Sequence, residues 1–134
     1  MVNYLAVIVA GLVAMALGAV WYSPALFGKA WMKLNGMKMP GKKPDKKMMT
    51  RSYVLGLLSQ LVKAYVLVYL MDMLGLVSIT GGLMTAFWAW LGFIATISIG
   101  SVLWEGKSWG LWLLNNAYNL VALLLMGLIL GAWV

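Results

Sequence analysis

The sequence contains no cysteine and no histidine, and only three of its 134 residues are acidic. Without cysteine the chain has no disulfide, no thiolate metal ligand and no thiol nucleophile. Without histidine it also lacks the commonest metal ligand and the side chain that most often exchanges protons near neutral pH. It has no glycine-rich phosphate-binding or dinucleotide-binding motif and no Ser-His-Asp set. We therefore expect no enzymatic activity, no cofactor and no metal site.

Apolar residues dominate instead and make up 64% of the chain. A soluble domain is roughly half apolar, so lipid is expected to be the solvent for most of this one. Four apolar stretches each approach or exceed the roughly 20 residues that an α-helix needs to cross a bilayer. We predict an all-α integral membrane protein, a four-helix bundle in a single domain over residues 1–134. The predicted spans are residues 4–22, 51–74, 83–104 and 111–134.

Positive charge is concentrated in one part of the chain. The formal net charge is +7, and eight of the ten basic residues lie between Gly28 and Arg51. Lysine and arginine accumulate in the cytoplasmic loops of membrane proteins. We therefore interpret residues 23–50 as a cytoplasmic basic loop, with both termini outside, and expect no nucleic-acid partner. The basic residues, which we expect to contact anionic lipid headgroups, are Lys29, Lys33, Lys38, Lys42, Lys43, Lys46, Lys47 and Arg51.

A short amphipathic segment follows the first span. Ser23 is a good helix N-cap and Pro24 a good first helical residue. An apolar stripe and a basic stripe then run along different faces, made up of Phe27, Trp31 and Leu34 and of Lys29 and Lys33. This pattern predicts a short helix over residues 24–35 that lies in the cytoplasmic headgroup layer. The alternative is a first span that continues beyond a kink at Pro24. We interpret residues 37–50 as a mobile loop.

Small residues recur at helical spacing in three of the predicted spans. Residues four apart lie on one face of a helix, and small ones let another helix approach closely. The alternative is that alanine and glycine are simply common in such helices. Three such faces exceed what one bundle needs, which favours a homo-oligomer. The sets are Ala10, Ala14 and Gly18; Gly92, Thr96 and Gly100; and Gly127 and Gly131.

Lys63 is the most informative single residue. It lies 12 positions after Arg51, which is about 18 Å along a helix and near the middle of a hydrocarbon core about 30 Å thick. A lysine there costs at least about 2.5 kcal/mol and must face protein or water. Polar residues of the third and fourth spans fall in the same half of the membrane, where hydrocarbon offers no hydrogen bonds. We predict a polar pocket, open to the cytoplasm, of Gln60, Lys63, Ser98, Ser101, Glu105, Asn115, Asn116 and Asn119.

Glu105 is the only acidic residue near that end of the helices, so we predict it as the charged partner of Lys63, directly or through water. The pocket has two interpretations. It is either a site for a solute, an ion or a lipid headgroup, or a set of interhelical contacts with a lysine that extends toward water.

The segment Asn3 to Lys33 carries a family resemblance. Its distinctive part is the turn Trp-Tyr-Ser-Pro at residues 21–24, followed by Leu-Phe-Gly-Lys-x-Trp at residues 26–31. Here the chain resembles the bacterial small-membrane-protein family known as domain of unknown function 1761, and its layout of four spans is also similar. The resemblance implies a multi-pass protein of the bacterial inner membrane, and both termini would then be periplasmic. It carries over no catalytic or ligand-binding residue.

Two functions are consistent with these features. The first is a homo-oligomeric transport or channel-like module whose solute site is the pocket around Lys63. The alternative is a structural or accessory membrane protein that binds anionic lipid or a partner protein through the basic loop. Replacement of Lys63 distinguishes a solute site from a purely structural pocket.

Overall fold

The computed structural model describes residues 3–23, 25–34 and 46–133, and all regular structure in these ranges is helical. Four of the helices are long and apolar enough to cross a membrane, the third of them running from Ile79 to Leu103 without a connecting loop. In chain order the elements are α1 (Tyr4–Trp21), α2 (Gly28–Leu34), α3 (Lys46–Leu74), α4 (Ile79–Ala89), the π-helical turn η1 (Trp90–Ala95), α5 (Thr96–Ser98), α6 (Gly100–Leu103) and α7 (Trp109–Ala132).

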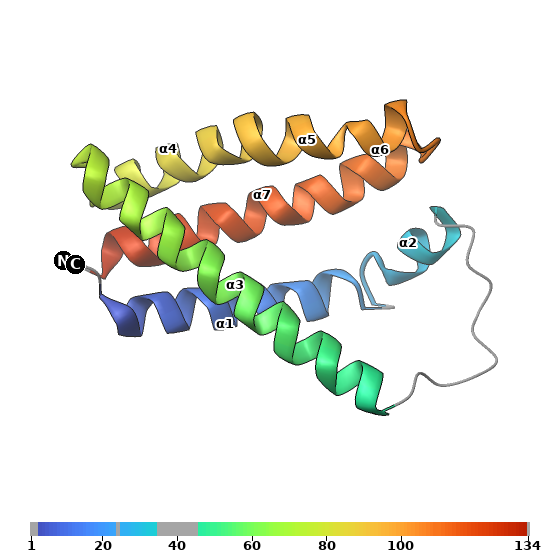
Figure 1. Cartoon of the computed structure of the whole chain (residues 1–134), viewed down its shortest axis with the longest axis horizontal. Coiled ribbons are helices and arrows are strands. Elements are labelled where there is room, and N and C mark those ends of the chain that lie inside the picture. The colour runs from blue at the N-terminus through green and yellow to red at the C-terminus, as the bar shows by residue number, and fades with distance from the viewer. Residues whose placement is uncertain (1–2, 24, 35–45, 134) are drawn as a thin grey trace.

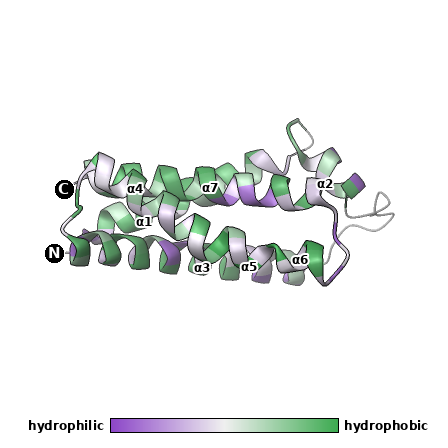
Figure 2. Cartoon of the chain, turned by 90° about the horizontal axis from the view of Figure 1, so that it is seen from above, coloured by the Kyte–Doolittle hydropathy of each residue, from purple (hydrophilic) through white to green (hydrophobic). Residues whose placement is uncertain are grey.

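The long helices pack side by side, with α7 lying along both α1 and the row from α4 to α6 (Figure 1). The α3 helix crosses α1 obliquely, so its N-terminal part diverges from α1 and α2 (Figure 1). At one end of the molecule the side-chain amide of Asn3 donates to the carbonyl oxygen of Trp133 at 3.3 Å. The opposite end, where α1 ends and α3 begins, is called the basic end below. Most residues of the long helices are hydrophobic (Figure 2), and many large apolar side chains on them are exposed.

Small side chains on α1 allow its close contacts with α3 and α7. Ala10 and Ala14 are completely buried. A Cβ at Gly11 would meet the side chain of Leu61 on α3, and one at Gly18 would meet the ring of Tyr118 on α7. The predicted small-residue face of the first span is therefore confirmed as a helix contact surface.

The contact between α4 and α7 is made by backbone on both sides. Gly82 lies against the backbone of Gly127, and Gly131 lies against the backbone of Ser78. The hydroxyl oxygen of Ser78 accepts a hydrogen bond from the backbone N–H of Gly81 at 2.9 Å and so caps α4. The α4 helix begins at Ile79, four residues before the predicted start of the third span at residue 83, so Gly81 and Gly82 belong to its first turn. There Gly82 lets α7 approach.

The third long helix is irregular in its second half. Its hydrogen bonds shift to the wider π pattern in η1, and the helix is interrupted again at Ile99. The hydroxyls of Thr96 and Ser101 donate to carbonyl oxygens of the preceding turn, a bond that commonly bends helices. A Cβ at Gly92 would meet no atom within 4 Å. At Gly92 the predicted small-residue face of the third span therefore contacts no other helix in the described part of the chain.

Two boundaries at the basic end differ from the sequence-based expectation. The short helix α2 begins at Gly28, four residues later than predicted, and a turn precedes it. The α3 helix begins at Lys46, so Lys46 and Lys47 are helical and do not belong to a loop. Pro24 and the predicted loop lysines Lys38, Lys42 and Lys43 lie outside the described residues.

Candidate functional site

Tyr118 joins three helices at the centre of the polar region. Its hydroxyl donates to the carbonyl oxygen of Ala14 on α1 at 2.8 Å and accepts from the side-chain amide of Gln60 on α3 at 3.2 Å. The Tyr118 side chain reaches this position because Gly18 leaves room for its ring. A single phenol on α7 therefore fixes the relative positions of α1, α3 and α7.

The end of α1 is attached to α7 by a second pair of contacts. The Tyr22 hydroxyl donates to Oδ1 of Asn115 at 2.7 Å, and the indole N–H of Trp21 donates to the carbonyl oxygen of Leu114 at 3.2 Å. These two contacts hold the C-terminal end of α1 against α7.

A separate polar group joins α7 to the third long helix. Ser98 Oγ lies 2.9 Å from Asn116 Oδ1 and accepts from the indole N–H of Trp112 at 3.1 Å. The side-chain amide of Asn116 donates to the backbone carbonyl oxygen of Trp112 at 2.9 Å. The backbone carbonyl oxygen of Asn116 accepts from the indole N–H of Trp90 at 3.0 Å. Asn116 is only 2% exposed. Because these groups satisfy one another, they act as contacts between helices.

Gln60 has the one side-chain polar atom in the described ranges that is buried without a hydrogen bond, its Oε1. Lys63 lies three residues later, one helical turn along α3 and partly buried. Asn119, also partly buried, follows Tyr118 directly on α7. A buried polar atom without a partner carries a desolvation cost of about 1–3 kcal/mol. Gln60, through Oε1, and Lys63 are therefore members of the predicted pocket that have polar capacity to offer a ligand.

The direct form of the predicted pairing, an ion pair between Glu105 and Lys63, is not formed. Glu105 is exposed in the turn after α6, and no ion pair joins it to Lys63 within the described part of the chain. Ser101 uses its hydroxyl within its own helix, on the carbonyl oxygen of Ser98 at 2.8 Å. The structure thus divides the predicted pocket: Ser98 and Asn116 bond each other, Asn115 bonds Tyr22, and Gln60 bonds Tyr118.

Sequence reasoning missed the aromatic partners of these amides, Tyr22, Trp90, Trp112 and Tyr118. A signal for them exists, because a tyrosine or tryptophan in an apolar helix needs a partner for its polar hydrogen. Tyr118 stands within the asparagine cluster of residues 115–119. Trp112 lies four residues before Asn116, on the same helix face.

The cations predicted to meet lipid headgroups are exposed wherever the structure describes them. Lys29 and Lys33 lie on α2, and Lys46, Lys47 and Arg51 on the first turns of α3. Lys107 adds a sixth cation in the turn before α7. Glu105 is the one acidic residue at this end among the described residues.

Four long apolar helices joined by a small number of polar contacts define the class of the protein, a multi-pass helical membrane protein. The model of the family described as "Protein of unknown function (DUF1761)" matches residues 5–131, so the chain belongs to that family. No curated protein and no solved structure matches the chain.

Proposed function

We propose that this protein is a four-helix bundle in the bacterial inner membrane with its basic end in the cytoplasm. The lengths and composition of the four long helices support the crossing of a bilayer. The six described cations at one end support the orientation, because such residues are retained on the cytoplasmic side. The short helix α2 then lies in the headgroup layer, and both termini are periplasmic.

Within this frame the protein binds a small polar solute at Gln60 and Lys63, as part of a transport module. The observation that carries this proposal is the buried Oε1 atom of Gln60, which has no hydrogen bond within the described residues, on a residue one helical turn before Lys63. A charged residue within a membrane helix is costly and is most often kept for function. Among the other predicted pocket residues, Ser98 and Asn116 bond each other and Asn115 bonds Tyr22, so these three need no ligand.

The chemistry of the two side chains defines the ligand class. The Lys63 ammonium has donors only, and Gln60 Oε1 is an acceptor only. A complementary solute carries a negative charge beside a hydrogen-bond donor, as hydroxy acids, amino acids and protonated phosphate do. Asn119 is positioned next to Tyr118 on α7 and is the third candidate contact. Transport requires a path that one chain of four helices hardly encloses, and a homo-oligomer supplies it.

The test is solute-dependent thermal stabilisation of the purified protein in detergent, with lactate, glycine and inorganic phosphate as probes. A solute that binds the folded state raises its melting temperature according to concentration and affinity. Lys63→Met is expected to abolish the stabilisation, while Lys107→Met, which removes an exposed lysine elsewhere, retains it. Uptake of the stabilising solute into proteoliposomes then distinguishes transport from binding. Identical solute responses in both variants would contradict the proposal.

The second candidate function is an accessory role through the basic end, and the clustering of exposed cations favours it. Each basic residue near an anionic membrane surface contributes about 1 kcal/mol of attraction. Replacement of Lys29, Lys33 and Lys46 by glutamine is expected to weaken binding to anionic lipid or to a partner. The measurement is co-purification of anionic lipid, with Lys63→Met as the control that leaves the surface unchanged.

A further inference from the structure

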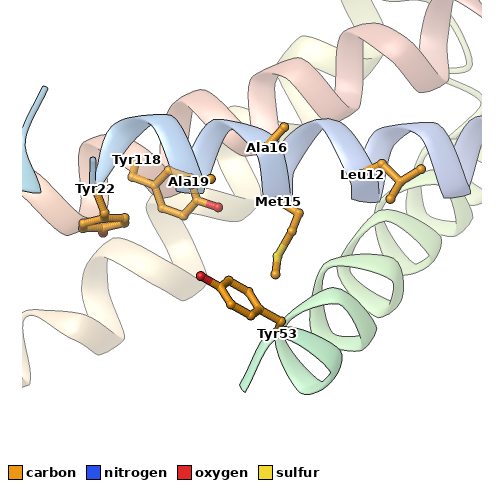
Figure 3. A pocket seen from close by; sticks show the side chains of 8 residues that line it. Leu12, Met15, Ala16, Ala19, Tyr22, Tyr53 and Tyr118 are labelled. Atoms are coloured by element: carbon orange, nitrogen blue, oxygen red, sulfur yellow. The ribbon is translucent and has the colours of Figure 1, made fainter. Parts of the chain in front are cut away.

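A groove runs between α1 and α3 in the half of the molecule that faces the basic end. Its volume is about 680 Å³, within the range of about 300–1,000 Å³ that is typical of ligand pockets. Its walls are mostly apolar, and three tyrosines stand at the end where α1 finishes (Figure 3). The lining residues are Leu12, Met15, Ala16, Gly18, Ala19, Tyr22, Tyr53 and Tyr118.

The groove exists because α1 and α3 touch near their middle and then diverge. Gly11 lets Leu61 of α3 approach α1, and from this contact the two helices separate toward the basic end (Figure 1). Beyond it α1 presents Ala16 and Ala19, which are exposed and too small to fill the space. The Tyr53 side chain points from α3 toward α1 across the opening (Figure 3).

We propose that this groove holds one acyl chain of an anionic lipid, whose phosphate headgroup binds the cations at the start of α3. The length of the groove agrees with this occupant. From Leu12 to Tyr22 the α1 helix rises about 15 Å. The hydrocarbon core of a bilayer is about 30 Å thick, so the groove spans the depth of one leaflet.

The charge at the open end of the groove selects the headgroup. Lys46 lies seven residues before Tyr53 and therefore on the same face of α3. Arg51 lies two residues before Tyr53 and therefore on a different face of α3. Asp72, at the far end of α3, is the single acidic residue within α1, α2 and α3. A negative headgroup at the groove is thus attracted by Lys46 and meets no nearby carboxylate on these helices.

This site is distinct from the solute site, because Lys63 and Gln60 do not line the groove, although Tyr118 lines it and bonds Gln60. It is also more specific than the general attraction of a basic surface for anionic lipid. A surface effect places lipid anywhere around the basic end, whereas the groove places one chain against a defined stretch of α1, from Leu12 to Tyr22.

The experiment uses the full chain in nanodiscs that contain phosphatidylglycerol or phosphatidylcholine with a photoreactive diazirine at mid-chain. After illumination, the adducts are located by peptide mass spectrometry. Phosphatidylglycerol is expected to label Leu12, Met15 or Ala16 more than the exposed Phe93 and Ile97 on the third long helix. Labelling of the groove by phosphatidylcholine is expected to be about five-fold weaker, since one cation contributes about 1 kcal/mol.

Two matched pairs of variants sharpen the result. Ala16→Phe fills the groove and is expected to remove its adducts, whereas Thr96→Phe adds the same bulk on another exposed face and leaves them. Lys46→Gln is expected to reduce the preference for phosphatidylglycerol, whereas Lys107→Gln at the same end leaves it unchanged. If Ala16→Phe does not fold, the comparison of the two lipids on the unaltered chain tests the proposal. Equal labelling of groove and Phe93 face, no headgroup preference, or cross-links to a second copy instead of lipid would each overturn the proposal.

Discussion

Gly82 of α4 and Gly127 of α7 face each other so closely that a Cβ on either residue would overlap the backbone of the other. Gly131 extends this contact, because a Cβ on it would overlap the backbone of Ser78. In lipid the apolar side chains are already out of water, so the hydrophobic effect does not drive helices together. Close packing of this kind stabilises helix association instead.

Gly127→Ala is expected to destabilise the fold by about 1–3 kcal/mol, because the added methyl group meets a backbone that cannot rotate away. The measurement is thermal unfolding of the purified protein in detergent. Gly92→Ala is the matched control, since a Cβ at Gly92 meets open space. It should be neutral or stabilise the helix by up to about 1 kcal/mol. Equal melting temperatures for the two variants would contradict the role of the Gly82–Gly127 contact.

Tyr118→Phe is expected to cost about 1–3 kcal/mol of stability, because it leaves the Gln60 amide without its acceptor. The Ala14 carbonyl also loses the hydroxyl that supplements its bond. Chemical unfolding in mixed micelles measures the loss. Tyr69→Phe removes the same hydroxyl from an exposed position on α3 and should change little. A Tyr118→Phe protein as stable as the Tyr69→Phe protein would show that the phenol does not hold the three helices together.

Ser98 and Asn116 are expected to be energetically coupled across the interface between α5 and α7. Side chains in one hydrogen-bonded group typically show interaction energies of about 0.5–3 kcal/mol in a double-mutant cycle. The cycle consists of Ser98→Ala, Asn116→Ala and the double variant, each followed by unfolding. Ser59, whose hydroxyl bonds within its own helix, supplies the control cycle of Ser59→Ala with Asn116→Ala. Additive effects at Ser98 and Asn116 would rule out the coupling.

Lys63→Met is expected to raise stability, by about 2.5 kcal/mol at most, since it removes a charge from the middle of an apolar helix. No ion pair of Lys63 within the described residues would be lost in exchange. Thermal unfolding tests this, with the exposed Lys107→Met as control. A large loss of stability would mean that the lysine serves the fold and would weaken the proposed solute site.

The natural absence of cysteine makes the chain a ready background for topology mapping. Single replacements Lys33→Cys on α2 and Thr80→Cys near the opposite end place one thiol at each end of the molecule. A membrane-impermeant maleimide added to intact cells is expected to label Thr80→Cys and not Lys33→Cys. Labelling of Lys33→Cys from outside would contradict the proposed orientation and place the basic end outside the cell.

Hydrophobic runs and charge alone predicted that the chain is helical and has four segments suited to a membrane, because length and polarity decide whether a helix suits lipid. The helix ends were less predictable. Gly81 and Gly82 look like a turn in the sequence, but both lie in the first turn of α4, where Gly82 packs against the backbone of α7. Lys46 looks like part of a loop, and it begins α3.

For the polar residues too, the sequence determined one part and the tertiary structure another. Sequence alone determined that Gln60, Lys63 and the asparagines at 115, 116 and 119 need partners, since apolar surroundings offer none. Tertiary structure decided which partners they have: Tyr118 for Gln60, Tyr22 for Asn115 and Ser98 for Asn116. The reason is physical, because burial cost depends on residue type and depth, whereas a hydrogen bond depends on the rotation and crossing of helices that are far apart in the chain.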